Sequence, residues 1–203
     1  MKVTKAQAQA NRALVVETAS QLFRERGFDG VGVADLMAAA GFTHGGFYKH
    51  FGSKADLMAE STACGIARTA ALSEGVDAPT FVSHYLSREH RDGRATGCTM
   101  AALGGDAARR PEPVREAFAD GVENLVAALS QQAGVSIAPD AAQARAGILD
   151  VLAHAVGALV MSRACPDDSP LADEFLAVSR HAILESLRPR KVSKATSRRR
   201  SVG

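Results

Sequence analysis

The sequence predicts an all-α protein, with a small N-terminal three-helix domain and a larger C-terminal helical domain. Apolar residues recur at helical spacing, alanine is abundant, and strand-like alternation is hard to find. The 203 residues, 46% of them apolar and 23% charged, suit one large or two modest globular domains. From the breaks in pattern we expect a first domain over residues 1–52, a connecting helix over 53–75, a helical domain over 76–188 and a tail over 189–203.

The first two helices are predicted from apolar periodicity and glycine stops. Residues 13–28 place their apolar side chains on one helix face, and Gly27 ends the helix. A second helix over 33–40 is capped by Gly32 and followed by Gly41, which is expected to leave the helix in a left-handed conformation.

A third short helix is expected directly after this turn, with the hydroxyl of Thr43 as its cap. On a helical wheel Phe47 and Phe51 share one direction, so we expect them to anchor the helix to the core. Two glycines in one short helix cost about 1 kcal/mol each, and close approach to another surface, such as a DNA major groove, would offset that cost. The outward face is then expected to hold Gly45, Gly46 and Lys49, flanked by His44, Tyr48 and His50.

This helix–turn–helix interpretation has an alternative, because the HGG sequence could form a loop and the aromatic residues could simply fill a core. The following helix adds to the first interpretation. Ser53 is its expected N-cap and Asp56 lies at the third helical position. Lys54 in that first turn opposes the helix dipole, and a DNA phosphate bound there would turn this small cost into a gain.

Residues 10 to about 60 resemble the N-terminal DNA-binding domain of the tetracycline-repressor (TetR) family. The matching pieces are LFRERGF, AAAGFTHGGFYKHF and SKADL, in the family's order and spacing. The resemblance implies binding to double-stranded DNA, with Thr43, Gly45, Tyr48, His50 and Lys54 at positions that commonly touch it. With the wheel, the expected DNA contacts are Thr43, His44, Gly45, Gly46, Tyr48, Lys49, His50 and Lys54.

Two residues depart from the family pattern. Gly32 stands where a Ser or Thr cap is usual, and it is only slightly worse as a cap. Met37 stands where a small Ala is usual at the helix crossing, so we expect it to widen that contact slightly. Both changes could alter the preferred DNA sequence without preventing binding.

In the C-terminal half we expect helices over 81–91, 99–110, 112–133, 140–164 and 170–187, with the second interrupted at Gly104 and Gly105. The stretch 147–161 is apolar nearly all round, which indicates burial on more than one side. The last helix adds an apolar stripe formed by Leu171, Phe175, Val178 and Ala182. We therefore expect a homodimer through a four-helix bundle, as in the TetR family, with an ordinary monomeric core as the alternative. Such a dimer would bind a palindromic operator with half-sites about 34–36 Å apart.

A small molecule bound among the C-terminal helices could change the separation of the two DNA-binding domains through the connecting helix, with a coupling of about 1–3 kcal/mol. The candidate lining is neutral and mostly apolar, which suits an aromatic or lipophilic effector. Each candidate could equally be plain core or surface. The candidates are Phe81, His84, Tyr85, Met100, Leu103, Phe118, Val122 and His154.

Cysteine and charge patterns add little further chemistry. Cys64, Cys98 and Cys165 lack metal-ligand spacing, so we expect no metal site and reduced packing thiols, with a redox role for Cys98 as the alternative. The net charge is +2, but seven basic residues and no acid lie from Arg188 onward. We expect this tail to be disordered, and either to aid solubility or to attract DNA phosphates nonspecifically.

Other classes of protein find less support. The N-terminus has no apolar signal segment, and stretch 147–161 is broken by Asp150 and His154 and is shorter than the ~20 residues needed to cross a bilayer, so we expect a cytoplasmic protein without a membrane partner. The sequence holds no nucleophile elbow, HExxH motif, phosphate-binding loop or dinucleotide fingerprint, so we expect neither an enzyme nor a cofactor. The leading hypothesis is a ligand-responsive transcriptional regulator, usually a repressor. The alternatives are a nonspecific DNA-compacting protein and an enzyme using scattered His and Cys.

Overall fold

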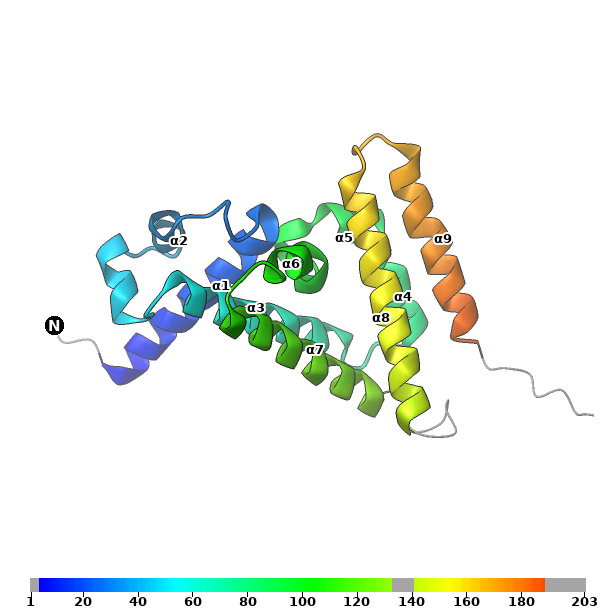
Figure 1. The fold of residues 1–203 in the computed structure, drawn as a ribbon, viewed down its shortest axis with the longest axis horizontal. Coiled ribbons are helices and arrows are strands. Elements are labelled where there is room, and N and C mark those ends of the chain that lie inside the picture. The colour runs from blue at the N-terminus through cyan, green and yellow to red at the C-terminus, as the bar shows by residue number, and fades with distance from the viewer. Residues whose placement is uncertain (1–3, 133–140, 189–203) are drawn as a thin grey trace, which may run out of the picture.

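The computed structural model describes residues 4–132 and 141–188, and the regular structure of these residues is all helical, as predicted. Figure 1 shows an elongated molecule with the N-terminal helices at one end and a pair of long helices at the other. The elements are α1 (Lys5–Arg26), α2 (Val33–Ala39), η1 (His44–Lys49), α3 (Lys54–Ser73), α4 (Ala78–Tyr85), α5 (Arg88–Asp92), η2 (Arg94–Thr96), α6 (Thr99–Ala107), α7 (Glu112–Gln132), α8 (Ala141–Ala164) and α9 (Pro170–Ser186).

The N-terminal helices close around one apolar core. Phe23 of α1, Leu36 of α2 and Leu57 of α3 are all fully buried in it. The predicted stops are confirmed, because Gly27 ends α1 with φ +74° and Gly41 follows α2 with φ +80°, a conformation that favours glycine. These turns bring α2 and η1 back against α1 and α3.

The predicted caps of α2 and α3 are also confirmed. Gly32 precedes α2, and its N–H donates to the carboxylate of Asp35 at 3.3 Å. The hydroxyl of Ser53 accepts from the N–H of Asp56 at 3.1 Å and starts α3. Helix α3 matches the predicted connecting helix and packs along α7, so it spans the two ends of the molecule (Figure 1).

Two predictions for the C-terminal half are wrong. The helix expected over 81–91 is two helices, because the chain leaves α4 at Leu86 and the hydroxyl of Ser87 caps α5 by accepting from the N–H of His90. Helix α6 is not interrupted, and it continues through Gly104 and Gly105. Gly104 lies against α7, where an added Cβ would be 3.6 Å from the ring of Phe118, an ordinary van der Waals contact that does not require glycine.

Helices α8 and α9 pack against each other, as Figure 1 shows, and their contact is the second core of the molecule together with α4 and α7. The predicted basic tail over 189–203 lies outside the described residues. Arg188, the first of its basic residues, is described and forms an ion pair with Glu185 at 2.7 Å.

Candidate nucleic-acid interface

Two phenylalanine rings fix the segment that was predicted to bind DNA. Phe47 and Phe51 are 1% and 3% exposed, and their ring centroids lie 5.4 Å apart with a 31° tilt. Their predicted role as core anchors is confirmed. Because these two rings face inward, several neighbouring residues, His44, Gly45, Tyr48 and Lys49, are turned toward solvent.

The segment itself differs from the prediction, because His44–Lys49 forms a 3₁₀-helix in place of an α-helix. Its backbone hydrogen bonds join residues three positions apart. For example, the N–H of Gly46 donates to the carbonyl of Thr43 at 2.9 Å. Thr43 occupies the N-cap position with extended backbone, but its side chain forms no capping hydrogen bond, so that prediction is wrong. A 3₁₀-helix is common in pieces this short, and two glycines weaken the preference for an α-helix.

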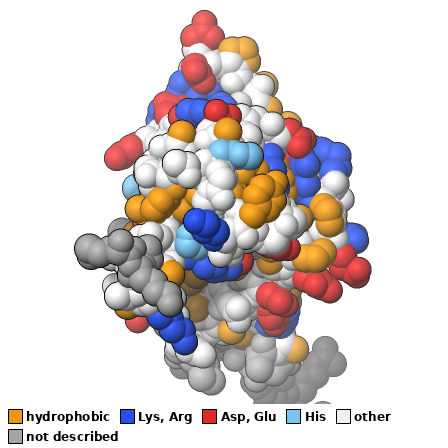
Figure 2. Space-filling model, turned by 90° about the vertical axis from the view of Figure 1, so that its left-hand side faces the viewer, with side chains coloured by type: hydrophobic (Ala, Val, Ile, Leu, Met, Phe, Trp, Pro, Cys, Tyr) orange, Lys and Arg blue, Asp and Glu red, His pale blue; other side chains and the backbone are white. Residues whose placement is uncertain are grey.

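Most of the predicted contact residues are exposed at this end of the molecule. Tyr48 is 68% exposed, and its ring meets His44 edge-on at 6.4 Å. Figure 2 shows this end, where histidine and basic side chains lie near the centre and acidic side chains lie mostly toward the margins. The exposed members of the predicted set are Thr43, His44, Gly45, Tyr48 and Lys49, and the half-buried members are Gly46, His50 and Lys54.

The two glycines have different surroundings. A Cβ added at Gly45 would meet nothing within 4 Å, so this position opens outward as predicted. A Cβ at Gly46 would lie 3.5 Å from the terminal methyl of Met37, so Gly46 faces α2 and the prediction that it points outward is wrong. The fully buried Met37 therefore faces a glycine, which accommodates the larger side chain at the helix crossing.

Lys54 donates a hydrogen bond within the protein. Its ammonium donates to the carbonyl of Phe28 at 2.6 Å and lies 5.9 Å from the ring centroid of Phe23. Burial lowers the pKa of Lys54, and the nearby Asp29 carboxylate opposes that shift. This lysine thus joins the start of α3 to the turn after α1, a role that the sequence did not indicate.

Arg12 of α1 is a functional residue that the sequence analysis missed. Its Nε donates to the carbonyl of His50 at 3.2 Å, and its guanidinium lies 4.7 Å from the ring centroid of Phe51. The same group forms a two-pronged ion pair with Glu60 of α3. Arg12 of α1 therefore connects the end of the exposed segment, at His50, to Glu60 of α3. No local pattern could reveal this, because the partners are far apart in the sequence.

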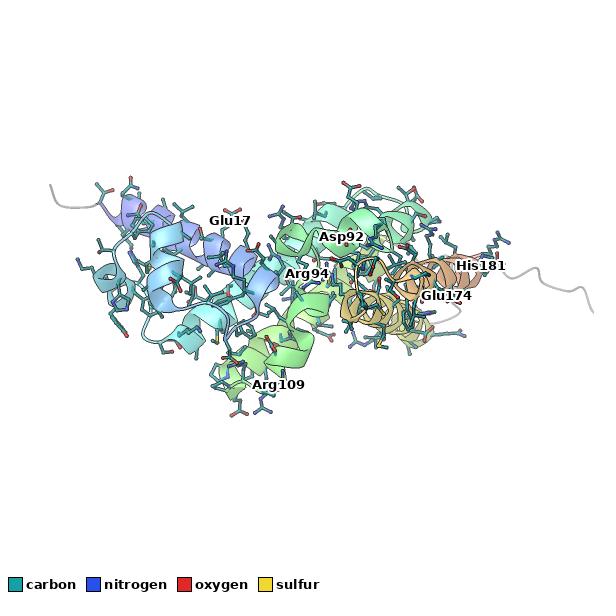
Figure 3. The ribbon with its side chains drawn as sticks, turned by 90° about the horizontal axis from the view of Figure 1, so that it is seen from above. Glu17, Asp92, Arg94, Arg109, Glu174 and His181 are labelled. Atoms are coloured by element: carbon teal, nitrogen blue, oxygen red, sulfur yellow. The ribbon has the colours of Figure 1, made fainter. Side chains whose placement is uncertain are left out.

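The predicted effector residues are only partly brought together. Tyr85 and Met100 are buried in one apolar cluster, and Phe81, Phe118 and Val122 pack against it. Leu103 belongs to the N-terminal core instead, and His84 and His154 are exposed. This cluster adjoins the middle of the molecule, where Arg94 is labelled between the N-terminal helices and the α8–α9 pair in Figure 3.

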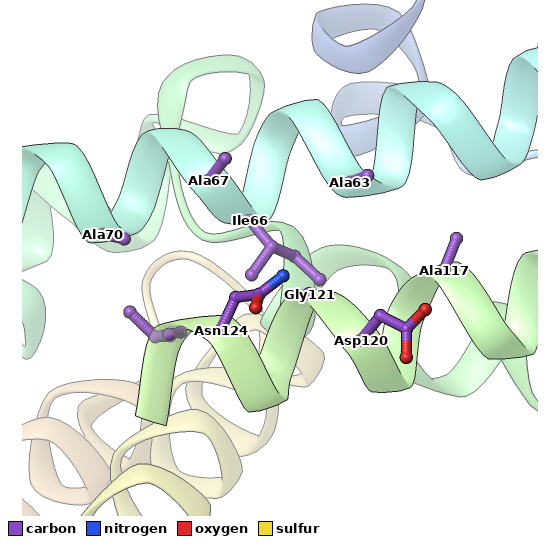
Figure 4. Close-up of a pocket in the computed structure, with 9 residues that line it drawn as sticks. Ala63, Ile66, Ala67, Ala70, Ala117, Asp120, Gly121 and Asn124 are labelled. Atoms are coloured by element: carbon purple, nitrogen blue, oxygen red, sulfur yellow. The ribbon is translucent and has the colours of Figure 1, made fainter. Parts of the chain in front are cut away.

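A cavity of about 430 Å³ lies elsewhere, between α3 and α7 (Figure 4). Its walls are mostly small and apolar, with Asp120 and Asn124 as polar groups, and the sequence analysis foresaw none of its lining. The cavity is lined by Ala63, Ile66, Ala67, Ala70, Ala117, Asp120, Gly121, Asn124 and Leu125.

Within the residues that the structure describes, His, Cys, Asp and Glu side chains form no group of three that could bind a metal.

Residues 15–61, which include the anchored segment and its two supporting helices, match the family model of the bacterial regulatory proteins of the tetR family. This match to the tetR-family model covers about a quarter of the chain. This agrees with the resemblance carried by the sequence motifs.

Individual relatives give the same result. Over 55 residues the chain is 42% identical to the HTH-type transcriptional regulator TtgR of Pseudomonas putida, an alignment that covers 27% of this chain and 26% of TtgR. Over 57 residues it is 37% identical to the HTH-type transcriptional regulator AcrR of Shigella flexneri, covering 28% of this chain and 26% of AcrR. The sequence match therefore spans about a quarter of these curated relatives.

Solved structures extend the likeness to the rest of the chain. The reduced form of NemR from E. coli superposes with a TM-score of 0.67 and 20% identity, covering 87% of this chain and 96% of NemR. A TetR-family transcriptional regulator from Cytophaga hutchinsonii superposes with a TM-score of 0.66 and 16% identity, covering 91% and 98% of the two chains. The C-terminal helices thus share the fold of TetR-family regulators.

Proposed function

We propose that this TetR-family protein is a dimeric, sequence-specific DNA-binding transcriptional regulator. It acts as a repressor that leaves a palindromic operator when a small apolar or aromatic effector binds its C-terminal domain. The observation that carries the proposal is the exposed segment His44–Lys49 fixed on the buried rings of Phe47 and Phe51. The names of its relatives TtgR and AcrR as transcriptional regulators support it.

On the DNA side, each exposed group has a distinct use. Tyr48 and Lys49 can donate to phosphates, and the open position at Gly45 lets the backbone approach a groove closely. Thr43, His44 and His50 flank this surface. Gly46 and Lys54, which face other parts of the protein, hold the segment in position in this proposal.

Dimerisation through α8 and α9 is supported by the apolar side chains of these two helices that are exposed to solvent. Leu176 and Ile183 are buried against the rest of the domain, whereas Leu171 and Val178 of the predicted stripe are 48% and 61% exposed. On α8, Leu149, Val160 and Met161 are exposed as well. A second copy of the same two helices would cover this apolar surface, as expected for a two-fold four-helix bundle.

By length and composition alone, α8 is also a candidate membrane span over Ala142–Ala164. Its last turns are bound within the protein, because Arg91 donates to the carbonyl of Ser162 and Arg163 donates to the carbonyl of His90. The dimer accounts for the exposed apolar side chains of this helix without a bilayer. The proposed regulator is therefore cytoplasmic and has no membrane partner.

Selection of bound fragments from genomic DNA tests the proposal. A regulator should enrich a palindrome whose half-sites are about one helical turn apart, and Tyr48→Ala should weaken binding to that palindrome with the fold intact. Binding that ignores sequence and falls only with salt would favour the nonspecific DNA-compacting alternative and overturn the proposal. An enzyme, the other alternative, would recover no preferred fragment.

A further inference from the structure

Two buried hydrogen-bond donors at the start of α6 have no acceptor. They are the hydroxyl of Tyr85, a residue that is 6% exposed, and Nη1 of Arg163. Buried polar groups in folded proteins almost always find partners, so two such donors in one neighbourhood indicate an acceptor that comes from outside the chain.

The Arg163 guanidinium is held in place by its other nitrogens. Its Nε donates to the carbonyl of Arg91 at 2.9 Å, and Nη2 donates to the carbonyl of His90 at 3.0 Å. A Cβ added at Gly97 would lie 3.0 Å from Nη2, so the backbone directly before α6 packs against this guanidinium. With two nitrogens fixed in this way, Nη1 is the remaining donor.

His90 holds Tyr85 and the start of α6 together. Its Nε2 accepts from the N–H of Cys98, the N-cap residue of α6, at 3.2 Å. Its Nδ1 must then carry the proton, and this nitrogen donates to the carbonyl of Tyr85 at 2.6 Å. The two rings lie 4.7 Å apart. Both nitrogens of His90 are therefore occupied, and His90 cannot accept from the Tyr85 hydroxyl.

Cys98 does not satisfy these donors either. After burial as the main cause, the charge of the Cys98 thiolate and its hydrogen bonding to the hydroxyl raise the pKa of Tyr85 further, but the pair lacks the geometry of a normal hydrogen bond. Sulfur is a weak acceptor. The Tyr85 hydroxyl thus remains protonated and available as a donor.

The surroundings of Arg163 lack a counter-charge. Burial lowers the pKa of its guanidinium, which Tyr85 and Cys98 oppose, and the nearby cations Arg94 and Arg91 lower it further. None of the carboxylates in residues 4–132 and 141–188 forms an ion pair with Arg163. Asp92, labelled with Arg94 in Figure 3, is already paired with Arg91 at 2.6 Å. A buried cation without a counter-charge is costly, and the positive end of the α6 dipole adds to the same field.

We propose that the Tyr85 hydroxyl and Arg163 Nη1 bind the carboxylate of a small lipophilic acid, whose apolar body lies in the adjoining cluster. This inference rests on the proposed function and names the chemical class of its effector. A carboxylate has two oxygens, which match one O–H and one N–H donor, and it supplies the missing negative charge. The ring of Phe81 lies 5.9 Å from that of Tyr85, and two further members of the same apolar cluster, Ile66 and Leu125, also line the α3–α7 cavity.

Matched pairs of ligands test the proposal on the full-length protein by titration calorimetry. The probes are octanoate with octanol, 4-phenylbutyrate with 4-phenylbutanol, and 1-naphthoate with 1-naphthylmethanol. At least one carboxylate should bind more than about tenfold more tightly than its alcohol, which corresponds to about 1.4 kcal/mol. The proposal is overturned if no carboxylate binds more tightly than its matched alcohol.

Substitutions at Tyr85 and Arg163 test whether these two residues cause the preference for a carboxylate over its matched alcohol. Tyr85→Phe removes a hydroxyl that has no partner, so the protein without ligand should melt at the same or a higher temperature, while the preference for the carboxylate should fall about tenfold. Arg163→Lys keeps the charge but loses the fixed donor, and it should also reduce the preference. Tyr48→Phe, which removes the hydroxyl of the other tyrosine, is the control for carboxylate binding measured without DNA. An unchanged preference in Tyr85→Phe would overturn the assignment.

Operator binding by the ligand-free protein separates this inference from the proposed function. A protein that binds its palindrome but shows no carboxylate preference refutes only the effector class. A protein that binds no specific DNA refutes the proposed function, whatever the carboxylate titrations show.

Discussion

At the scale of single residues, two lysines of equal charge have separate tasks. Lys49 is exposed on the segment that faces DNA in the proposed function, whereas the ammonium of Lys54 is bound to the carbonyl of Phe28 at 2.6 Å. A hydrogen bond from a charged donor contributes about 1.5–3 kcal/mol, and partial exposure reduces that value. Their substitutions should therefore affect different properties.

Lys54→Ala should lower the free energy of unfolding by about 1 kcal/mol, because it removes the bond between α3 and the turn after α1. Lys49→Ala should leave unfolding within about 0.5 kcal/mol of the original protein, and should instead reduce the salt dependence of DNA binding by about one phosphate contact. Urea unfolding and binding titrations at several salt concentrations measure both effects. If Lys54→Ala instead reduced the salt dependence of DNA binding and left the free energy of unfolding unchanged, Lys54 would contact DNA.

At the scale of elements, η1 contains a glycine, Gly45, that we explain by contact with another molecule. Positive φ among the described residues is confined to Gly27, Gly41 and Gly75, so neither Gly45 nor Gly46 is required by its backbone conformation. Alanine would fit at Gly45 without any contact and at Gly46 with an ordinary contact to Met37. Close approach of another molecule remains as the reason for Gly45.

Gly45→Ala should raise the free energy of unfolding by about 0.5 kcal/mol, since it restricts the unfolded chain, and yet lower operator affinity about tenfold because its methyl group faces DNA. Gly46→Ala is the matched control, because its methyl group points to Met37, and its operator affinity should change little. Fluorescence anisotropy with the selected palindrome measures both. Equal affinity for Gly45→Ala and the original protein would argue against backbone approach.

The elements also show how far the sequence could predict the structure. The stops at Gly27 and Gly41, the Ser53 cap and the pairing of Phe47 with Phe51 depend on residues a few positions apart, and these predictions are confirmed. The environment of Tyr85 depends on Arg163, a residue on a distant helix. Such tertiary contacts override local propensity and leave no periodic signal.

Four elements, α1, η2, α3 and α6, meet at a tightly packed polar junction. Arg24 of α1 is 4% exposed, and its Nε donates to the carbonyl of Ala95 at 2.9 Å, while Nη1 contacts the hydroxyls of Ser20 and Thr99. At Gly65 of α3, an added Cβ would lie 2.2 Å from the Thr99 hydroxyl oxygen. The junction therefore joins the N-terminal helices, which bind DNA in the proposed function, to α6, where the proposed carboxylate binds.

Gly65→Ala should separate α3 from α6 and lower the free energy of unfolding by about 1–3 kcal/mol, the usual cost of overpacking a core. Gly105→Ala in α6 is the control, because a Cβ there meets nothing within 4 Å and should be neutral or slightly stabilising. Denaturant unfolding of both variants measures the difference. Equal stability would mean that the junction adjusts without cost.

At the scale of the whole molecule, the exposed segment His44–Lys49 and the α8–α9 pair lie at opposite ends of an elongated chain (Figure 1). One such segment contacts only a few base pairs, so affinity for a palindrome depends on a partner that supplies the second segment at a separation of about 34–36 Å. The apolar α8–α9 surface would then determine DNA affinity from a distance.

Val178→Asp should break the dimer, because it places a charge on the most exposed apolar residue of α9 without disturbing the buried contacts of Leu176 and Ile183. Sedimentation should show monomers with unchanged helix content, and operator affinity should fall by about a hundredfold or more as the second half-site becomes a separate binding event. Leu72→Asp is the matched control, since Leu72 of α3 is 59% exposed against 61% for Val178. It should remain dimeric and bind the operator normally. A Val178→Asp protein that stays dimeric would place the interface elsewhere, and a monomer with full affinity would contradict the two-fold mode of DNA binding.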